Sequence, residues 1–147
     1  MADEDKSGSS PRACIPDRFY FHTEAINSGE YSELVYSRGA LRFRAGVVFR
    51  QTPDRQFQCT ADAGAWSRFW QRVDQIGVWN WKPDYTNSLV QGGLKWNLEI
   101  GYAGRALKTG GQRSYPGSNG PGYTAESEFG QFLAAVQALA GVSEFSW

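Results

Sequence analysis

The stretch LKWNLEIGY, Leu94–Tyr102, alternates between apolar side chains and side chains that are polar or small. Successive side chains of a β-strand point to opposite faces, so this period of two predicts a strand with one buried face. Trp96 shares the apolar parity of the stretch with Leu94, Leu98, Ile100 and Tyr102. We therefore interpret Trp96 as a core residue rather than as part of a binding site.

Segments on both sides of this stretch also favour strands. The residues from 18 to 26 and from 31 to 39 are rich in aromatic and β-branched side chains and are separated by the turn cluster NSGE, which predicts a hairpin. Residues 40–50, ALRFRAGVVFR, also alternate: every second residue from Leu41 to Phe49 is apolar, and the residues between them include arginines. A break or bulge in this strand is expected at Gly46. A short strand at residues 105–108 is expected to return antiparallel to 94–102.

Two segments show the spacing of amphipathic helices instead. Between Trp66 and Ile76 the large apolar residues recur three or four positions apart, with Thr60 or Asp62 as the cap and Gly77 as the stop. A second helix is expected from about Thr124 to Ala140, ended by Gly141. These patterns predict an α+β fold, a single mainly antiparallel sheet of about five strands with two amphipathic helices packed on one face.

The length of 147 residues is that of one domain. We expect residues 1–16, which are polar and rich in Ser, Asp and Pro, to form a mobile leader, and residues 17–147 to form the domain. Fifteen basic residues balance fifteen acidic ones, so no overall field favours nucleic acid or an anionic membrane. The start of the chain lacks the pattern of a secretory signal, which favours the cytoplasm and reduced thiols at Cys14 and Cys59.

A longer run carries a resemblance. VWNWKPDYTNSLVQGGLKWNLEI, then KTGGQRSYPG, then FGQFLAAVQAL resemble a widespread type of small bacterial domain with a Trp…Tyr…Gly…Trp-x-Leu pattern, a later Tyr-Pro and a C-terminal amphipathic helix. The similarity covers roughly residues 78–139. It departs from that pattern at Gln91, where an acidic residue would commonly precede the glycine, and in the glycine-rich insert after Tyr115 and Pro116. The resemblance implies an α+β fold and assigns no catalytic residue.

Residues that commonly carry catalysis are sparse. His22 is the only histidine, and strand alternation places it beside Tyr20 and Glu24, within reach of a proton-transfer arrangement; a polar outer face explains the same pattern more simply. One histidine and two distant cysteines make a poor zinc set, and the glycine-rich segment lacks the order of a phosphate-binding loop. We expect no metal and no cofactor, and an enzyme, such as a hydrolase centred on His22, is the least favoured function.

Candidate binding residues lie in three places. Arg42, Arg44 and Arg50 share a parity and predict a basic stripe on the sheet face away from the helices, unless acidic neighbours pair with them. A second cluster in the connection after the first helix suits a sugar ring or an apolar partner, or else forms a lid over the core; it consists of Trp79, Trp81 and Tyr85. Phe145 and Trp147 follow the final glycine and either fold back on the domain or anchor a partner.

Missing catalytic motifs together with these aromatic and arginine residues favour a non-enzymatic binding module that acts through a protein partner, in the manner of an immunity or adaptor protein. A second copy of the chain is an alternative partner. The alternative function is a small-ligand or carbohydrate-binding protein that uses Trp79, Trp81 and Tyr85.

Overall fold

A computed structural model describes residues 14–89, 91–118 and 122–141. Seven strands form one sheet in the order β5-β4-β3-β2-β7-β8-β6. All neighbouring strands are antiparallel except β6 and β8, which are parallel. The strands are β2 (Arg18–Ala25), β3 (Glu30–Ser37), β4 (Ala40–Val47), β5 (Arg55–Cys59), β6 (Tyr85–Thr86), β7 (Leu94–Tyr102) and β8 (Arg105–Gln112).

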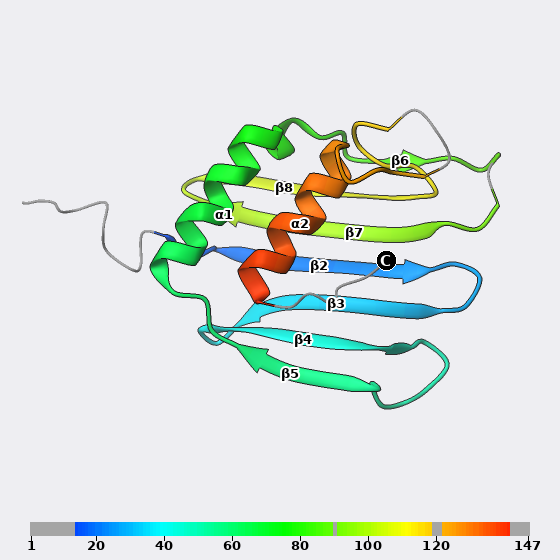
Figure 1. The fold of residues 1–147 in the computed structure, drawn as a ribbon, viewed down its shortest axis with the longest axis horizontal. Helices are drawn as coiled ribbons and strands as arrows, with labels where there is room; N and C mark the ends of the chain where they lie inside the picture. The colour runs from blue at the N-terminus through cyan, green and yellow to red at the C-terminus, as the bar shows by residue number, and fades with distance from the viewer. Residues whose placement is uncertain (1–13, 90, 119–121, 142–147) are drawn as a thin grey trace, which may run out of the picture.

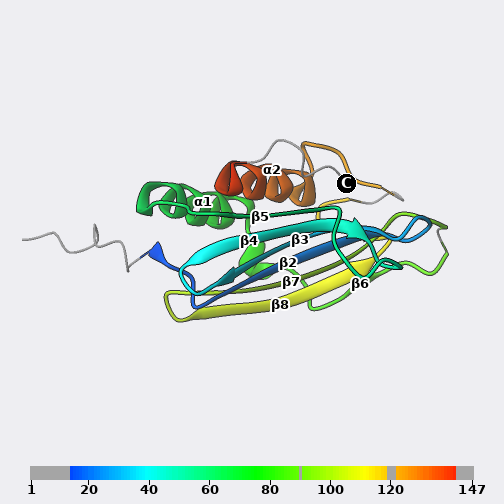
Figure 2. The ribbon, with the colours of Figure 1, turned by 90° about the horizontal axis from the view of Figure 1, so that it is seen from below.

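Two helices, α1 (Ala63–Ile76) and α2 (Glu128–Ala140), lie side by side on one face of this sheet (Figures 1 and 2). The view along the sheet in Figure 2 shows one helical layer and one sheet layer, with both α-helices of the described residues on the same face. The predicted α+β class and the two helices on one face are therefore confirmed. The predicted number of about five strands is too small, because the sequence reading omitted the short edge strands β5 and β6.

Local sequence explains both helix ends of α1. The Asp62 side chain accepts a hydrogen bond from the Ala65 N–H at 2.8 Å, and Gly77 ends the helix with a φ of 86°. Helix α2 begins later than predicted, because Ser127 caps it through the Gly130 N–H, and it ends at Gly141 as expected. A 3-10 helix, Val78–Asn80, follows α1 directly.

Burial follows the alternation of the central strands. Trp96 and Leu98 are fully buried under the helices, as the pattern of β7 predicts. The core joins side chains from the helix-facing side of the sheet to those of both helices: Phe19, Phe21, Leu34, Leu41, Phe43, Trp66, Phe69, Trp70, Val73, Trp96, Leu98, Ile100, Phe129, Phe132 and Val136. Cys14, which we assigned to the leader, is buried as well, and its carbonyl oxygen accepts the Trp70 indole N–H at 2.8 Å.

The third predicted strand ends earlier than its sequence pattern indicates. Strand β4 stops at Val47, and residues 48–54 form the turn to β5. Phe49 was predicted to lie on the apolar, inward face, and this prediction is wrong: its side chain is 79% exposed. Gly46 pairs with Tyr31 inside the strand, so the ladder continues through the expected break.

Candidate binding surfaces

The helix-free face of the sheet carries one half-buried polar cluster. His22 on β2 lies opposite Glu33 on β3, and Glu33 lies opposite Arg44 on β4. The Glu33 carboxylate accepts hydrogen bonds from Arg44 Nη2 at 2.6 Å and Nε at 3.2 Å, and it lies 3.1 Å from His22 Nδ1. The other ring nitrogen of His22, Nε2, lies 3.4 Å from the Glu24 carboxylate. His22 thus links two carboxylates.

Aromatic rings flank the cluster. Tyr20 and Tyr31 both stack on His22, with interplanar angles of 5° and 13°. The hydrogen bond from His22, reinforced by Arg44, lowers the pKa of Glu33 from 4.5 to about 2. Burial, and then the nearby Glu33 charge, raises the pKa of Tyr20. The arrangement holds Glu33 as a carboxylate at neutral pH, and both nitrogens of the only histidine are occupied by acidic neighbours.

The three predicted stripe arginines do not form one stripe. Arg42 and Arg44 lie side by side on the helix-free face of β4, where Arg42 donates to Gln58 at 2.8 Å and Arg44 to Glu33. Arg50 lies in the β4–β5 turn and pairs with Asp54 at 3.0 Å. Each of these guanidinium groups therefore has a partner within the fold. Such pairing was the alternative to a ligand-binding stripe in the sequence analysis.

The three aromatic residues after α1 pack on different neighbours. Trp81 is 6% exposed beneath α2, and its indole N–H donates to Glu128 at 2.9 Å. Trp79 stacks on Trp70 and lies under the Arg105 guanidinium, 4.5 Å from the ring centroid. The hydroxyl oxygen of Tyr85 accepts a hydrogen bond from the Lys82 N–H.

No ring contact joins Trp79, Trp81 and Tyr85 to one another among the described residues. Trp81 and Tyr85 instead meet the same core ring, Trp96, with centroids 6.0 and 5.9 Å away. These side chains thus pack on core rings, as expected of a lid over the core, and do not form one open aromatic site for a ligand. Phe145 and Trp147, the third predicted site, lie outside the described residues.

The β4–β5 turn presents an apolar surface that the sequence reading missed. Val48 is 44% exposed and Phe49 is 79% exposed, and the two follow each other at the tip of β4. They lie over Gly29 in the β2–β3 turn, where an added Cβ would come within 2.9 Å of Val48 and 3.1 Å of Phe49. With a φ of 74°, Gly29 supplies both the turn geometry and the room that these side chains need.

One backbone hydrogen bond joins the two turns, and a second closes the β4–β5 turn itself. The Val48 N–H donates to the Gly29 carbonyl oxygen at 2.9 Å, and the Arg50 N–H donates to the Val47 carbonyl oxygen at 3.0 Å. The sequence does contain a signal for this site, the cluster RQTPD directly after Phe49. Proline and aspartate favour turns, so the strand is expected to end near Phe49.

Several classes of site have no support in the part of the chain that is described. No group of three or more His, Cys, Asp or Glu side chains suited to a metal ion lies among residues 14–89, 91–118 and 122–141. Both cysteines are free thiols. Within the same ranges, neither helix has the length and apolar character needed to cross a membrane.

Comparison with known proteins adds no family. No protein-family model matches the chain. A comparison with curated proteins likewise found no match. The resemblance of residues 78–139 to a small bacterial domain therefore stays a prediction, and function has to be inferred from the surfaces themselves.

Proposed function

We propose that the protein is a non-enzymatic binding module that acts through a protein partner, and that the partner contacts the β4–β5 turn. The observation that carries this proposal is the 79% exposure of Phe49 beside the exposed Val48. Large apolar side chains that are exposed together on an ordered loop are enriched at protein interfaces, where aromatic residues supply much of the contact area.

The order of the turn supports the proposal. Backbone hydrogen bonds tie Val48 to Gly29 and Arg50 to Val47, and the Arg50 guanidinium contacts both carboxylate oxygens of Asp54 at 3.0 and 3.2 Å. A loop that is held in its binding conformation loses little conformational entropy when a partner binds. The neighbouring charges of Arg50 and Asp54 are paired with each other, which leaves Val48 and Phe49 as the part of this turn that a partner would cover.

The chemistry of the partner follows from this surface. Phe49 projects from a turn, so the complementary site is an apolar pocket on a folded protein that accepts one aromatic ring. An immunity- or adaptor-like role fits a small domain of this kind, because such proteins act by occupying a surface of another protein. The His22 cluster supports an enzyme less well, because Glu33 and Glu24 already occupy both ring nitrogens.

Phe49→Ala should weaken partner binding by about a hundredfold, the effect expected of a central interface residue, and should leave the fold intact. The experiment captures proteins from source cells on the immobilised full-length chain and measures the affinity of each candidate by titration. Ile15→Ala is the matched control, because Ile15 is also an exposed apolar residue, at 36%, but lies outside the turn.

Two further variants separate this proposal from the other candidate surfaces. Arg42→Gln with Arg44→Gln tests the helix-free face, and a chain that ends at Gly141 tests Phe145 and Trp147. The proposal is supported if the partner no longer binds Phe49→Ala but still binds Ile15→Ala, the double arginine variant and the shortened chain. A partner that Phe49→Ala binds with unchanged affinity contradicts it, and so does recovery of a small molecule with no protein.

A further inference from the structure

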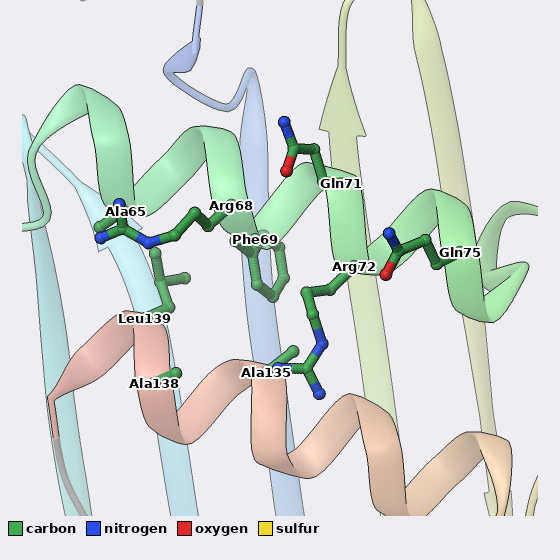
Figure 3. A pocket seen from close by; sticks show the side chains of 9 residues that line it. All are labelled: Ala65, Arg68, Phe69, Gln71, Arg72, Gln75, Ala135, Ala138 and Leu139. Carbon is green, nitrogen blue, oxygen red and sulfur yellow. The ribbon is translucent and has the colours of Figure 1, made fainter.

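A cavity of about 300 Å³ lies between the two helices, and Figure 3 shows its lining side chains with the sheet behind both helices. We call it the α1–α2 groove. Figure 3 shows α1 and α2 running beside each other, with Phe69 between them; the side chain of Arg72 reaches toward α2, whereas that of Arg68 runs along α1 toward Ala65. The groove is lined by Ala65, Arg68, Phe69, Gln71, Arg72, Gln75, Ala135, Ala138 and Leu139.

Small side chains on α2 create this space. Ala135 and Ala138 face α1 at the groove, where longer side chains would fill the gap between the helices. Phe69, Ala135 and Leu139 are buried and form an apolar base. The volume is at the lower end of the range that binds small molecules in proteins, which suits a compact or narrow ligand.

Two guanidinium groups give the groove its charge. Its lining contains Arg68 and Arg72 and no acidic side chain. Arg68 is exposed and forms no ion pair with the described residues, although the carboxylate of Asp62, which caps α1, also lies near Gly64. Arg72 is half-buried and donates only one long hydrogen bond, of 3.5 Å, to the Gln131 carbonyl oxygen on α2. Both groups therefore keep donors for an anion.

Several arginines elsewhere in the fold behave differently. Arg44, Arg50 and Arg105 each lie within 3.0 Å of a carboxylate oxygen, and Arg42 donates to Gln58. The described residues of α2 after Glu128 carry no charge at all, so nothing on that wall of the groove offsets the two guanidinium groups. The local charge is positive although the whole chain is neutral.

We propose that the α1–α2 groove binds a small amphipathic carboxylate, a molecule with one carboxylate group and an apolar chain or ring. The apolar part would lie on Phe69, Leu139 and the alanines, and the carboxylate would accept hydrogen bonds from Arg68 and Arg72. Guanidinium groups match a carboxylate with two parallel hydrogen bonds, which favours this anion. A polyanion such as a nucleic acid fits less well, because the apolar base offers no contact for further charges.

The test measures binding of decanoate to the full-length chain by isothermal titration calorimetry, below the concentration at which decanoate forms micelles. Saturable binding at one site is expected. Ala138→Leu fills the groove and should weaken binding about tenfold or more, whereas Ala134→Leu should leave it unchanged. Both alanines are exposed on α2 and leucine is a good helix former, but Ala138 lines the groove and Ala134 does not.

A second pair of variants tests the charge. Arg68→Gln with Arg72→Gln should weaken decanoate binding about tenfold or more, and Arg42→Gln, an exposed arginine on the opposite face, should not. Decanol, which has the same chain without the carboxylate, should bind more weakly than decanoate. Equal binding to Ala138→Leu and Ala134→Leu, equal binding of decanol and decanoate, or binding that does not saturate would each overturn the proposal.

Discussion

Replacing Trp96 by alanine is expected to lower the free energy of unfolding by about 4 kcal/mol, within the range for buried tryptophan truncations. Trp96 is fully buried, its indole N–H donates to the Ser114 carbonyl oxygen at 3.0 Å, and its ring contacts Trp81, Tyr85 and Phe129. The substitution leaves a cavity that these rings cannot close. Urea unfolding followed by circular dichroism measures the loss.

Trp79→Ala is the matched control for this prediction. Trp79 is half-buried, its indole N–H donates to Asp74 at 3.0 Å near the surface, and one side of its ring is covered by Arg105. Trp79→Ala should lower the free energy of unfolding by less than half as much as Trp96→Ala. Equal losses in the two variants would contradict the assignment of Trp96 to the core. Loss of sugar or small-ligand binding by Trp79→Ala in a stable protein would instead support the alternative function.

Glu33→Gln is expected to lower the free energy of unfolding at pH 7 by about 3 to 4 kcal/mol at most. The pKa of Glu33 falls from 4.5 to about 2 in the folded protein, and each unit corresponds to about 1.4 kcal/mol. The folded state thus favours the ionised carboxylate, which is 11% exposed. This stabilisation is present above the unfolded pKa and is lost as the pH falls from about 5 to about 2.

Unfolding curves of the wild type and of Glu33→Gln at several pH values test this prediction. The difference between the two should be largest at neutral pH and should vanish near pH 2, because the neighbouring Tyr20, His22, Glu24 and Arg44 remain in both proteins. Glu99→Gln is the control, since Glu99 pairs with the 61% exposed Arg18 and should contribute little. A difference that does not change with pH would show that Glu33 acts through packing alone.

Much of the architecture could be predicted from local patterns. The period of two in β7 and the helical spacing of α1 each hold over many residues, and both patterns locate the buried side correctly. The glycine stops at Gly77 and Gly141 were also correct, because a left-handed helix end is a local requirement of the backbone. The short edge strand β6, by contrast, has only two residues and depends on its contact with β8.

The candidate sites were less accessible to sequence reasoning. Strict alternation placed Phe49 in the core, but the turn that follows β4 ends the strand before it. Trp81 and Tyr85 were read with Trp79 as one aromatic loop, although the structure directs two of them to Trp96 and the third to Trp70. The α1–α2 groove had no signal in the sequence, because it depends on which residues of α1 and α2 face each other.

The sequence by itself determined the α+β class, the glycine ends of both helices and the buried face of the central strands, because each depends on residues a few positions apart. Only the tertiary structure decided which arginines find carboxylates, where Phe49 lies and that Ala138 and Arg68 line the same groove. Those features join residues that are far apart in the chain, and their energies depend on distance and burial, which no local pattern contains.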